Sequence, residues 1–233
     1  MNRRKFVKVI PSLAILSGGV SAYGLKALDL QELKPIVLPK PDNLESKPLF
    51  NSLMDRKTTR NISEKELPVQ IMSNLLWSAF GVNRETLGFN KKGRTAPSAS
   101  NSQEIDLYVV LLEGVYIYEP INHQLLPVAE GDFRSRSVYK GGAFAPVNIF
   151  FVVDLSRYDL GPTQPDPNIG DPEVQKSYYY TDTGFIAQNI YLYAASAGLA
   201  AWFHNCDKVN TIKDFKLKPT QRVLFAQTVG YPE

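Results

Sequence analysis

A short basic segment, DRKTTRNI, holds the side chains whose chemistry is easiest to infer. The cations Arg56, Lys57 and Arg60 flank two hydroxyl groups, those of Thr58 and Thr59. Guanidinium groups match phosphate oxygens with paired hydrogen bonds, and hydroxyl groups add single donors. The segment therefore favours a phosphate-binding site, although a solvated basic turn would have the same composition.

A second polar segment, RTAPSASNSQE, precedes a run of β-forming residues. Its hydroxyl and amide groups offer donors and acceptors close to backbone N–H groups, which suits a planar polar heterocycle or a ribityl chain. A helix-capping turn is the alternative interpretation. The candidate binding residues are Pro97, Ser98, Asn101 and Gln103.

A third segment, residues 181–205, reads as a long helix rich in small side chains. It ends at Gly198 and leads into aromatic residues and His204. Small side chains allow close packing, so core packing alone would explain this segment.

The remaining patterns predict the elements that hold these segments in place. Apolar residues at helical spacing indicate a helix near 67–80, with Ser63 and Glu66 at capping-box spacing ahead of it and Gly81 at its end. Strands are expected at 105–112, 146–154 and 222–232, a hairpin at 114–129, short helices at 49–57 and 209–215, and a long loop at 155–173. Because helices and strands interleave, the fold class is α+β or mixed α/β.

The order and spacing of the three segments resemble the nitroreductase superfamily of FMN-dependent oxidoreductases. The resemblance covers about residues 49–232. The family opens with R-x-[ST]-x-[RK], which falls on Arg56, Thr58 and Arg60, with Thr59 as an extra hydroxyl candidate. Its P-S-x-x-N-x-Q stretch falls on residues 97–103, and GVYIYEPINHQL resembles the branch that includes the azoline-oxidising dehydrogenases.

The resemblance implies a three-layer α/β/α sandwich with a mainly antiparallel sheet, in a homodimer with two FMN at its interface. Residues of the first segment would bind the flavin phosphate or pyrimidine edge, and Asn101 would contact the ring system. The backbone of Phe203, His204 and Asn205 would approach the flavin. Hydride would pass through flavin N5, so no catalytic triad is expected and the cofactor carries the chemistry.

Two departures from the family pattern matter. Many members continue past the last strand with a basic pair that helps to hold the phosphate, whereas this sequence stops at Glu233. Arg56 and Arg60, together with Arg94, would then carry that load. The usual proline and aromatic residue after the motif glutamine are replaced by Glu104 and Ile105.

The N-terminus reads as an export signal. RRKFVK at residues 3–8 resembles the twin-arginine consensus, and a 14-residue apolar run, too short to span a bilayer comfortably, follows up to Ala22. A general secretion signal and an uncleaved amphipathic anchor, which would leave the protein membrane-associated, are the alternatives. We therefore expect a signal peptide at 1–22, an extended linker at 23–48 and a flavin-binding domain at 49–233, located in the periplasm or otherwise exported.

Charge and composition exclude other classes. Four of the 26 basic residues lie within the first eight positions, which leaves 22 basic against 23 acidic residues in the rest of the chain. Nucleic-acid binding by the domain therefore lacks electrostatic support. The single cysteine, Cys206, excludes an intrachain disulfide and favours a buried thiol, and two isolated histidines give no metal-ligand spacing.

The sequence leaves three functions open. The first is an exported FMN oxidoreductase acting on a small organic or peptide substrate. Because NAD(P)H is confined to the cytoplasm, its electron donor would be a quinol, a partner protein or the substrate itself. The others are a flavin carrier or sensor without turnover, and an envelope binding module without flavin.

Overall fold

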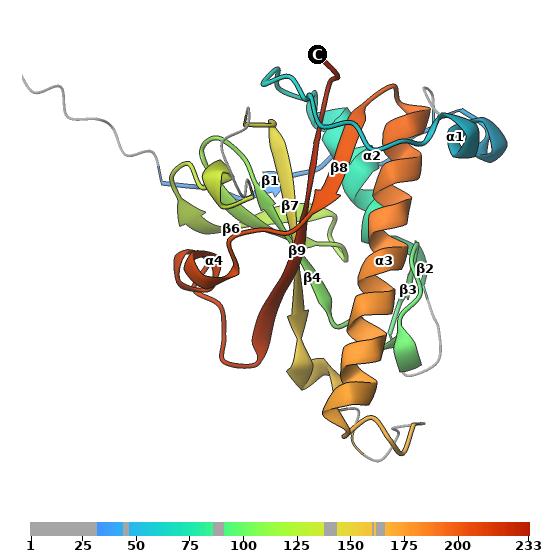
Figure 1. The fold of residues 1–233 in the computed structure, drawn as a ribbon, viewed down its shortest axis with the longest axis vertical. Coiled ribbons are helices and arrows are strands. Elements are labelled where there is room, and N and C mark those ends of the chain that lie inside the picture. Colours follow the sequence, from blue (N-terminus) through green and yellow to red (C-terminus); the bar gives the residue numbers. More distant parts are fainter. Residues whose placement is uncertain (1–31, 44–46, 86–90, 138–143, 160, 162–165) are drawn as a thin grey trace, which may run out of the picture. The chain divides into compact units, whose positions relative to one another are not determined.

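The computed structural model describes residues 32–43, 47–85, 91–137, 144–159, 161 and 166–233. The expected signal peptide and the first part of the expected linker lie outside these residues. The described chain from Glu32 onward belongs to one compact unit (Figure 1). Among the described residues, no helix combines the length and apolar character that a membrane crossing requires.

A seven-stranded sheet runs through the centre of this unit, in the order β1-β6-β5-β4-β7-β9-β8. All of its registered strand pairs are antiparallel. A separate two-stranded ribbon pairs β2 with β3. The strands are β1 (Ile36–Val37), β2 (Val82–Arg84), β3 (Gly93–Arg94), β4 (Ile105–Val110), β5 (Gly114–Glu119), β6 (Gln124–Glu130), β7 (Val147–Asp154), β8 (Ala200–His204) and β9 (Gln221–Gly230).

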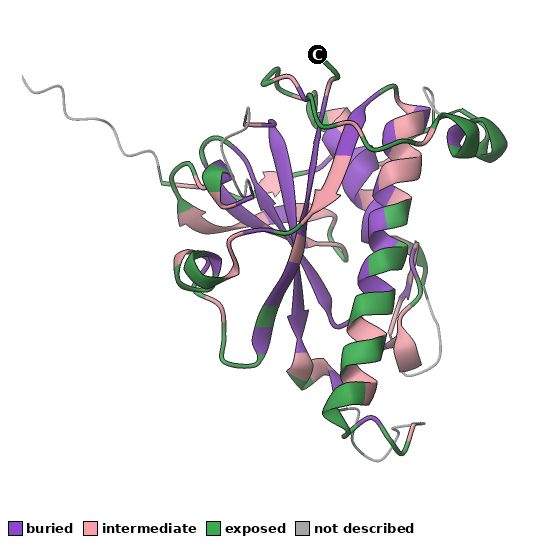
Figure 2. Ribbon diagram, viewed as in Figure 1, coloured by how far each residue is buried: buried purple, intermediate pink, exposed green. Residues whose placement is uncertain are grey.

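Helices cover both faces of the sheet. The helices are α1 (Leu49–Asp55), α2 (Val69–Phe80), α3 (Pro172–Ser196) and α4 (Lys208–Asp214). The larger core joins α2 and α3 to one sheet face, and the smaller core packs Phe215, just after α4, against the other face. Figure 2 shows the buried sheet between these layers. The predicted α+β class with a three-layer arrangement is confirmed.

The strand and the hairpin predicted from the strongest apolar patterns are present in the structure. The run at 146–154 forms β7, whose eight residues are all buried between β4 and β9. The predicted hairpin forms β5 and β6, and residues 120–123 make its turn. A strand that is buried on both faces needs no alternation of polar and apolar residues, so its sequence is a continuous apolar run.

The described part of the expected linker contributes a strand to the sheet. Ile36 and Val37 pair with Leu125 and Gln124, which makes β1 an edge strand. Leu38 follows and is buried in the larger core. This stretch is therefore extended, as its prolines suggest, and it packs against the domain.

Helix α2 starts differently from the prediction. The expected capping box does not form, since the residue before the helix is Pro68 and no side chain caps the helix. The Ser63 hydroxyl instead accepts a hydrogen bond from the Lys65 N–H. The predicted end is correct: Gly81 follows Phe80, and a Cβ there would lie 2.4 Å from the Trp77 ring, so only glycine fits.

Helix α3 is bounded by local signals at both ends. Asp171 caps its first turn by accepting from the Glu173 N–H, and Pro172 takes the first helical position. At the other end Gly198 adopts a φ of +68°, and the Leu199 N–H bonds the Ala194 carbonyl, as in a Schellman motif. The chain reverses there and enters β8, a strand that the sequence did not predict.

Candidate active site

The basic segment lies between α3 and the free edge of β8. The Thr59 N–H donates to the Ala201 carbonyl of β8 at 3.0 Å. Farther along the chain, Ile62 forms a β-bridge with Pro232. Backbone contacts thus fix a segment whose side chains are mostly exposed: Lys57, Thr58 and Arg60 are exposed, and Arg56 and Thr59 are half-buried.

Tyr191 of α3 connects this segment to β8. Its hydroxyl lies 3.1 Å from Thr58 Oγ1 and accepts a 2.8 Å hydrogen bond from the Phe203 N–H. The guanidinium of Arg56 lies over the Tyr191 ring, 5.5 Å from its centroid. The basic segment, through Thr58, and β8, through Phe203, therefore both contact Tyr191.

The cations of the basic segment have no acidic partners among the described residues. None of Arg56, Lys57 and Arg60 forms an ion pair there. Arg60 lies over the Trp202 ring, at 5.6 Å from its centroid. Unpaired guanidinium and ammonium groups beside hydroxyls are the donor set that a phosphate needs.

A cavity of about 430 Å³ opens beside this segment. Lys57 and Thr59 line one side, and the turn at Gly198 that ends α3 lines another. Two carboxylates also reach it: Asp55, which is paired with Lys47 at 2.6 Å, and Glu233. The cavity therefore has mixed charge, with ammonium groups from Lys47 and Lys57 and carboxylates from Asp55 and Glu233.

The side chains of Phe203 and His204, two of the three residues expected to approach the flavin from β8, lie on opposite faces of the sheet. Phe203 packs into the larger core beside Phe151 and Phe225. Its neighbour in the strand, His204, points to the other face, where its ring lies tilted against the Trp202 ring with 4.3 Å between the two centroids. Asn205 follows the strand and is exposed. The structure thus keeps the backbone of these residues together but separates their side chains.

His204 has a defined tautomer and a free ring nitrogen. Its Nδ1 lies 2.8 Å from the Asn205 carbonyl oxygen, so this nitrogen carries the proton. Nε2 is buried without a hydrogen-bond partner among the described residues. Burial lowers the pKa of the ring, which keeps it neutral and leaves Nε2 as an acceptor.

The second predicted segment forms a tight turn before β4. Ser100, Asn101 and Gln103 all have φ near +50°, a conformation that costs energy for residues other than glycine. Side-chain bonds hold the turn: the Gln103 N–H donates to Ser98 Oγ, and Gln103 Nε2 donates to Asn101 Oδ1. Pro97 is exposed at its start. Such a strained and well-bonded turn presents fixed polar groups.

Two buried carboxyl groups, those of Asp182 and Glu104, accept hydrogen bonds from this turn. Asp182 of α3 accepts from the Ala99 N–H at 2.9 Å, and Glu104 accepts from the Ser102 hydroxyl at 2.5 Å. Burial first, and the neighbouring Glu104 second, raise the pKa of Asp182 above its ordinary value. Of the two residues that replace the usual family pattern here, Glu104 is acidic and Ile105 is apolar, and both are buried.

The two polar segments lie at different heights on α3. The basic segment contacts Tyr191 and the turn contacts Asp182, which is nine residues earlier in the same helix. At 1.5 Å per residue this is a rise of about 13 Å. Within one chain, the basic segment therefore lies beside Phe203, whereas the turn at 97–103 lies apart from both.

The sequence reasoning missed several residues of these sites. Tyr191 carried no signal, because a tyrosine in a long helix is ordinary core material. Asp182 did carry one: it lies four residues before Ile186 and eight before Ile190 on the buried stripe. An acid in that register predicts a buried carboxyl group with a specific partner.

Comparison with known proteins identifies the family of the chain. Residues 53–231 match the Nitroreductase family. A candidate nitroreductase of Methanocaldococcus jannaschii is 28% identical over 201 residues, which is 82% of this chain and 93% of that protein. The crystal structure of a candidate nitroreductase from Ralstonia eutropha is 33% identical, covers 86% of this chain and 90% of that chain, and superposes with a TM-score of 0.75.

A more distant structural relative belongs to a larger assembly. A chain of the E. coli microcin synthetase complex, determined with a truncated pro-microcin bound, is 21% identical, covers 93% of this chain and 85% of that chain, and has a TM-score of 0.59. This likeness concerns the fold. Together, the matched residues and the sandwich fold define an oxidoreductase scaffold. The chain belongs to the Nitroreductase family.

Proposed function

We propose that the protein is an FMN-dependent oxidoreductase whose flavin binds against the basic segment and the junction of α3 with β8. The observation that carries this proposal is the set of three cations at 56–60 that lack acidic partners in the described chain while backbone bonds hold them beside β8. When bound, FMN supplies a ring nitrogen that accepts and returns hydride.

The chain's own residues position the cofactor. Arg56 and Arg60 offer guanidinium forks to the phosphate, and Thr58 offers a hydroxyl that Tyr191 orients. The aromatic ring of Tyr191 holds Arg56, and that of Trp202 holds Arg60. Stacked guanidinium groups lose less freedom on binding than free ones, so this arrangement favours phosphate capture.

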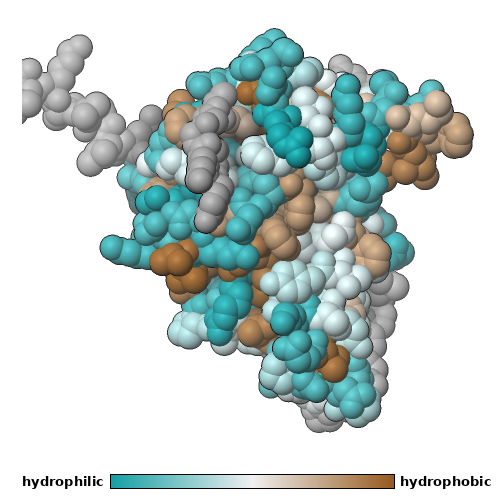
Figure 3. Space-filling view, in the orientation of Figure 1, coloured by the Kyte–Doolittle hydropathy of each residue, from teal (hydrophilic) through white to brown (hydrophobic). Residues whose placement is uncertain are grey.

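A homodimer would complete the site. Helix α1 buries only Ser52 and exposes four apolar side chains on one face, as the brown surface over α1 in Figure 3 shows. These side chains are Leu49, Phe50, Leu53 and Met54, which are 50–74% exposed. In a second copy this face would find a cover, and the turn at 97–103, held apart in one chain, could meet the partner's flavin.

The proposed substrate is a small organic molecule or a peptide. The peptide alternative is supported by the resemblance of residues 114–125 to the azoline-oxidising branch and by the fold shared with a complex that holds a pro-microcin. The twin-arginine-like N-terminus supports export of the folded protein. The electron donor would then be a quinol, a partner protein or the substrate, rather than NAD(P)H.

One experiment separates this function from a flavin carrier. The protein is purified, its bound flavin is identified by absorbance and mass, and the photoreduced protein is mixed anaerobically with quinones, nitroaromatics or oxygen in a stopped-flow instrument. We expect bound FMN and fast reoxidation by at least one acceptor. Bound FMN without accelerated reoxidation by any acceptor would indicate a carrier or sensor, and no flavin at all would contradict the proposal.

A further inference from the structure

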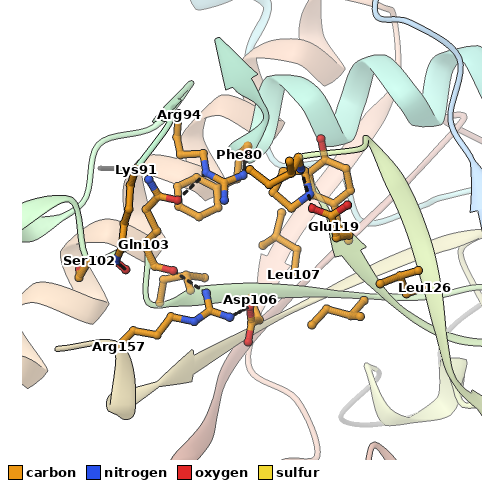
Figure 4. A pocket seen from close by; sticks show the side chains of 15 residues that line it. Phe80, Lys91, Arg94, Ser102, Gln103, Asp106, Leu107, Glu119, Leu126 and Arg157 are labelled. Carbon is orange, nitrogen blue, oxygen red and sulfur yellow. Dashed lines mark hydrogen bonds and ion pairs between the residues drawn. The ribbon is translucent and has the colours of Figure 1, made fainter. Parts of the chain in front are cut away.

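Strand β5 pairs with only the second half of β4 and separates from its first half. Their ladder covers three pairs and ends at Tyr108 with Ile117, whereas β4 stays paired with β7 as far as Ile105 with Val153. A cavity of about 410 Å³ occupies the gap, which we call the β4–β5 wedge (Figure 4). Its volume is within the range of small-molecule sites.

Apolar side chains form much of the wedge. They come from α2, β4, β5 and β6 and comprise Phe80, Ile105, Leu107, Ile117 and Leu126. In Figure 4 Leu107 and Leu126 lie on one side of the cavity and the Phe80 ring on another. These walls favour a ligand with an apolar, ring-sized body.

Three cations reach the same cavity. Arg94 donates to Gln103 Oε1 at 2.8 Å and to the Phe80 carbonyl, and its guanidinium lies over the Phe80 ring. Lys91 donates to the Ser102 carbonyl at 2.8 Å. Arg157 donates to the Gln103 carbonyl and forms an ion pair with Asp106.

The positive charge in the wedge exceeds the negative charge. Only Arg157 has a carboxylate partner, and among the described residues neither Arg94 nor Lys91 forms an ion pair. The Glu119 carboxylate also lines the cavity, but backbone and side-chain N–H groups of the turn after β5 already bond it.

Burial and mutual repulsion lower the pKa values of Arg94 and Lys91. Burial, followed by Arg157 among the repelling charges, lowers the pKa of Arg94 to about 10, although Tyr118 and two acids oppose the change. Burial and Arg157 also lower the pKa of Lys91, against the attraction of Glu104. A bound anion would relieve the repulsion and replace lost solvation.

We infer that the β4–β5 wedge binds an organic anion, a carboxylate carried on an apolar body of about one or two rings. Arg94 and Lys91 would receive the carboxylate, and the apolar walls would receive the rings. The inference does not depend on the basic segment, since none of Arg56, Tyr191 and Phe203 lines the wedge. It does involve two residues expected near the flavin: Gln103 lines the wedge, and Arg94, expected to help hold the phosphate, is instead bonded to Gln103 and the Phe80 carbonyl.

The wedge nevertheless communicates with the polar turn through Gln103. One end of its amide accepts from Arg94 and the other donates to Asn101. A ligand that draws Arg94 away from Gln103 would loosen that turn. Binding must therefore be measured on the protein both with and without FMN.

The test uses 2-naphthoate as the probe in isothermal titration calorimetry. Its neutral analogue, 2-naphthylmethanol, and inorganic phosphate serve as comparison ligands. We expect 2-naphthoate to bind at least tenfold more tightly than either one, with and without FMN. Equal binding of the alcohol would remove the role of the cations, equal binding of phosphate would remove the role of the apolar walls, and displacement of the probe by FMN would assign the wedge to the flavin site; each outcome overturns the inference.

Two variants locate the probe. Lys91→Met keeps the aliphatic stem and removes the charge, and we expect about tenfold weaker binding. Lys92→Met is the matched control, because Lys92 is paired with Glu85 and does not line the wedge. Leu126→Trp fills the apolar side from a half-buried position and should abolish binding. Unchanged affinity in both Lys91→Met and Leu126→Trp, with circular dichroism showing folded protein, would place the probe elsewhere.

Discussion

The hydroxyl of Tyr191 accepts a hydrogen bond of 2.8 Å from the backbone N–H of Phe203. The same oxygen lies 3.1 Å from the Thr58 hydroxyl, so one side chain of α3 sets the position of both β8 and the basic segment. Because β8 is the edge strand of the sheet, no neighbouring strand in the described part of the chain bonds its outward N–H groups. Tyr191 therefore substitutes for a missing strand at this point.

Tyr191→Phe should weaken both folding and flavin binding. It leaves the Phe203 N–H without its acceptor, which costs about 1–3 kcal/mol for a buried group, and it frees the Thr58 hydroxyl. Urea unfolding would measure the first effect and FMN titration the second. Tyr180→Phe, on the exposed side of the same helix, is the control and should change neither. Equal behaviour of the two variants would contradict the role given to Tyr191.

Loss of a cation from the basic segment should lower FMN occupancy without unfolding the protein. Arg56→Ala and Arg60→Ala each remove a charge-assisted contact to the phosphate, at a cost of roughly 1.5–3 kcal/mol in binding. Asn101→Ala should lower occupancy as well, through the ring system. Flavin absorbance per protein after gel filtration measures this. Arg222→Ala at the exposed start of β9 is the control, and full occupancy in all the site variants would reject the site assignment.

Polar substitution on α1 should dissociate the proposed dimer. Phe50 and Met54 are 73% and 74% exposed on one helix face, so Phe50→Ser with Met54→Ser removes the apolar surface without disturbing the core. We expect a monomer with reduced FMN content in light scattering coupled to gel filtration. Val209→Ser, at a 79% exposed apolar position on α4, should leave the dimer intact. A dimer that survives the α1 changes must use another surface.

Asp182→Asn should change how stability depends on pH. The pKa of Asp182 is raised in the folded protein, so the folded state binds this proton more tightly than the unfolded state does. Its contribution is complete below the unfolded pKa of about 4 and declines as the pH rises toward the raised folded pKa. Asparagine can still accept from the Ala99 N–H and does not titrate.

The measurable quantity is the difference in the free energy of unfolding between this variant and the wild type. We expect that difference to favour the variant by roughly 1 kcal/mol more at pH 8 than at pH 5. Urea titrations at the two pH values provide it. A difference that is the same at both would show that Asp182 ionises as easily in the folded chain as in the unfolded one.

Cys206 should be unreactive in the native protein. It is 2% exposed, and burial raises the pKa of its thiol to about 12, so very little thiolate exists at pH 8. Labelling with Ellman's reagent should proceed only after urea unfolding, and then to one thiol per chain. Fast labelling of the folded protein would mean that the smaller core opens readily on this side.

Local pattern was enough for much of the fold. The apolar run of β7, the hairpin of β5 and β6 and the glycine after α2 each contain their own signal within ten or so residues. The basic segment was recognisable for the same reason, since its cations and hydroxyls are neighbours in the chain. Features determined by adjacent residues are the ones that a sequence displays directly.

Features that depend on distant contacts were not predictable. The residues that form β8 follow a long helix, and no polar turn residues separate the two in the sequence. They form a strand because they pair with β9. The wedge brings together Lys91 and Arg157, which are 66 positions apart in the sequence and bond the adjacent carbonyls of Ser102 and Gln103. Nothing local to either cation indicates the other, because their proximity follows from the sheet order.

The sheet order has a consequence for how the protein folds. β9 follows β8 in the chain but lies between β7 and β8, so within the described residues β8 pairs with β9 alone in the sheet. The Phe203 backbone therefore takes its final place only after the last strand has docked, and such nonlocal pairing is slow. We expect the proposed flavin site at the junction of α3 with β8 to be the latest part of the molecule to assemble, so that cofactor retention would report the completion of folding.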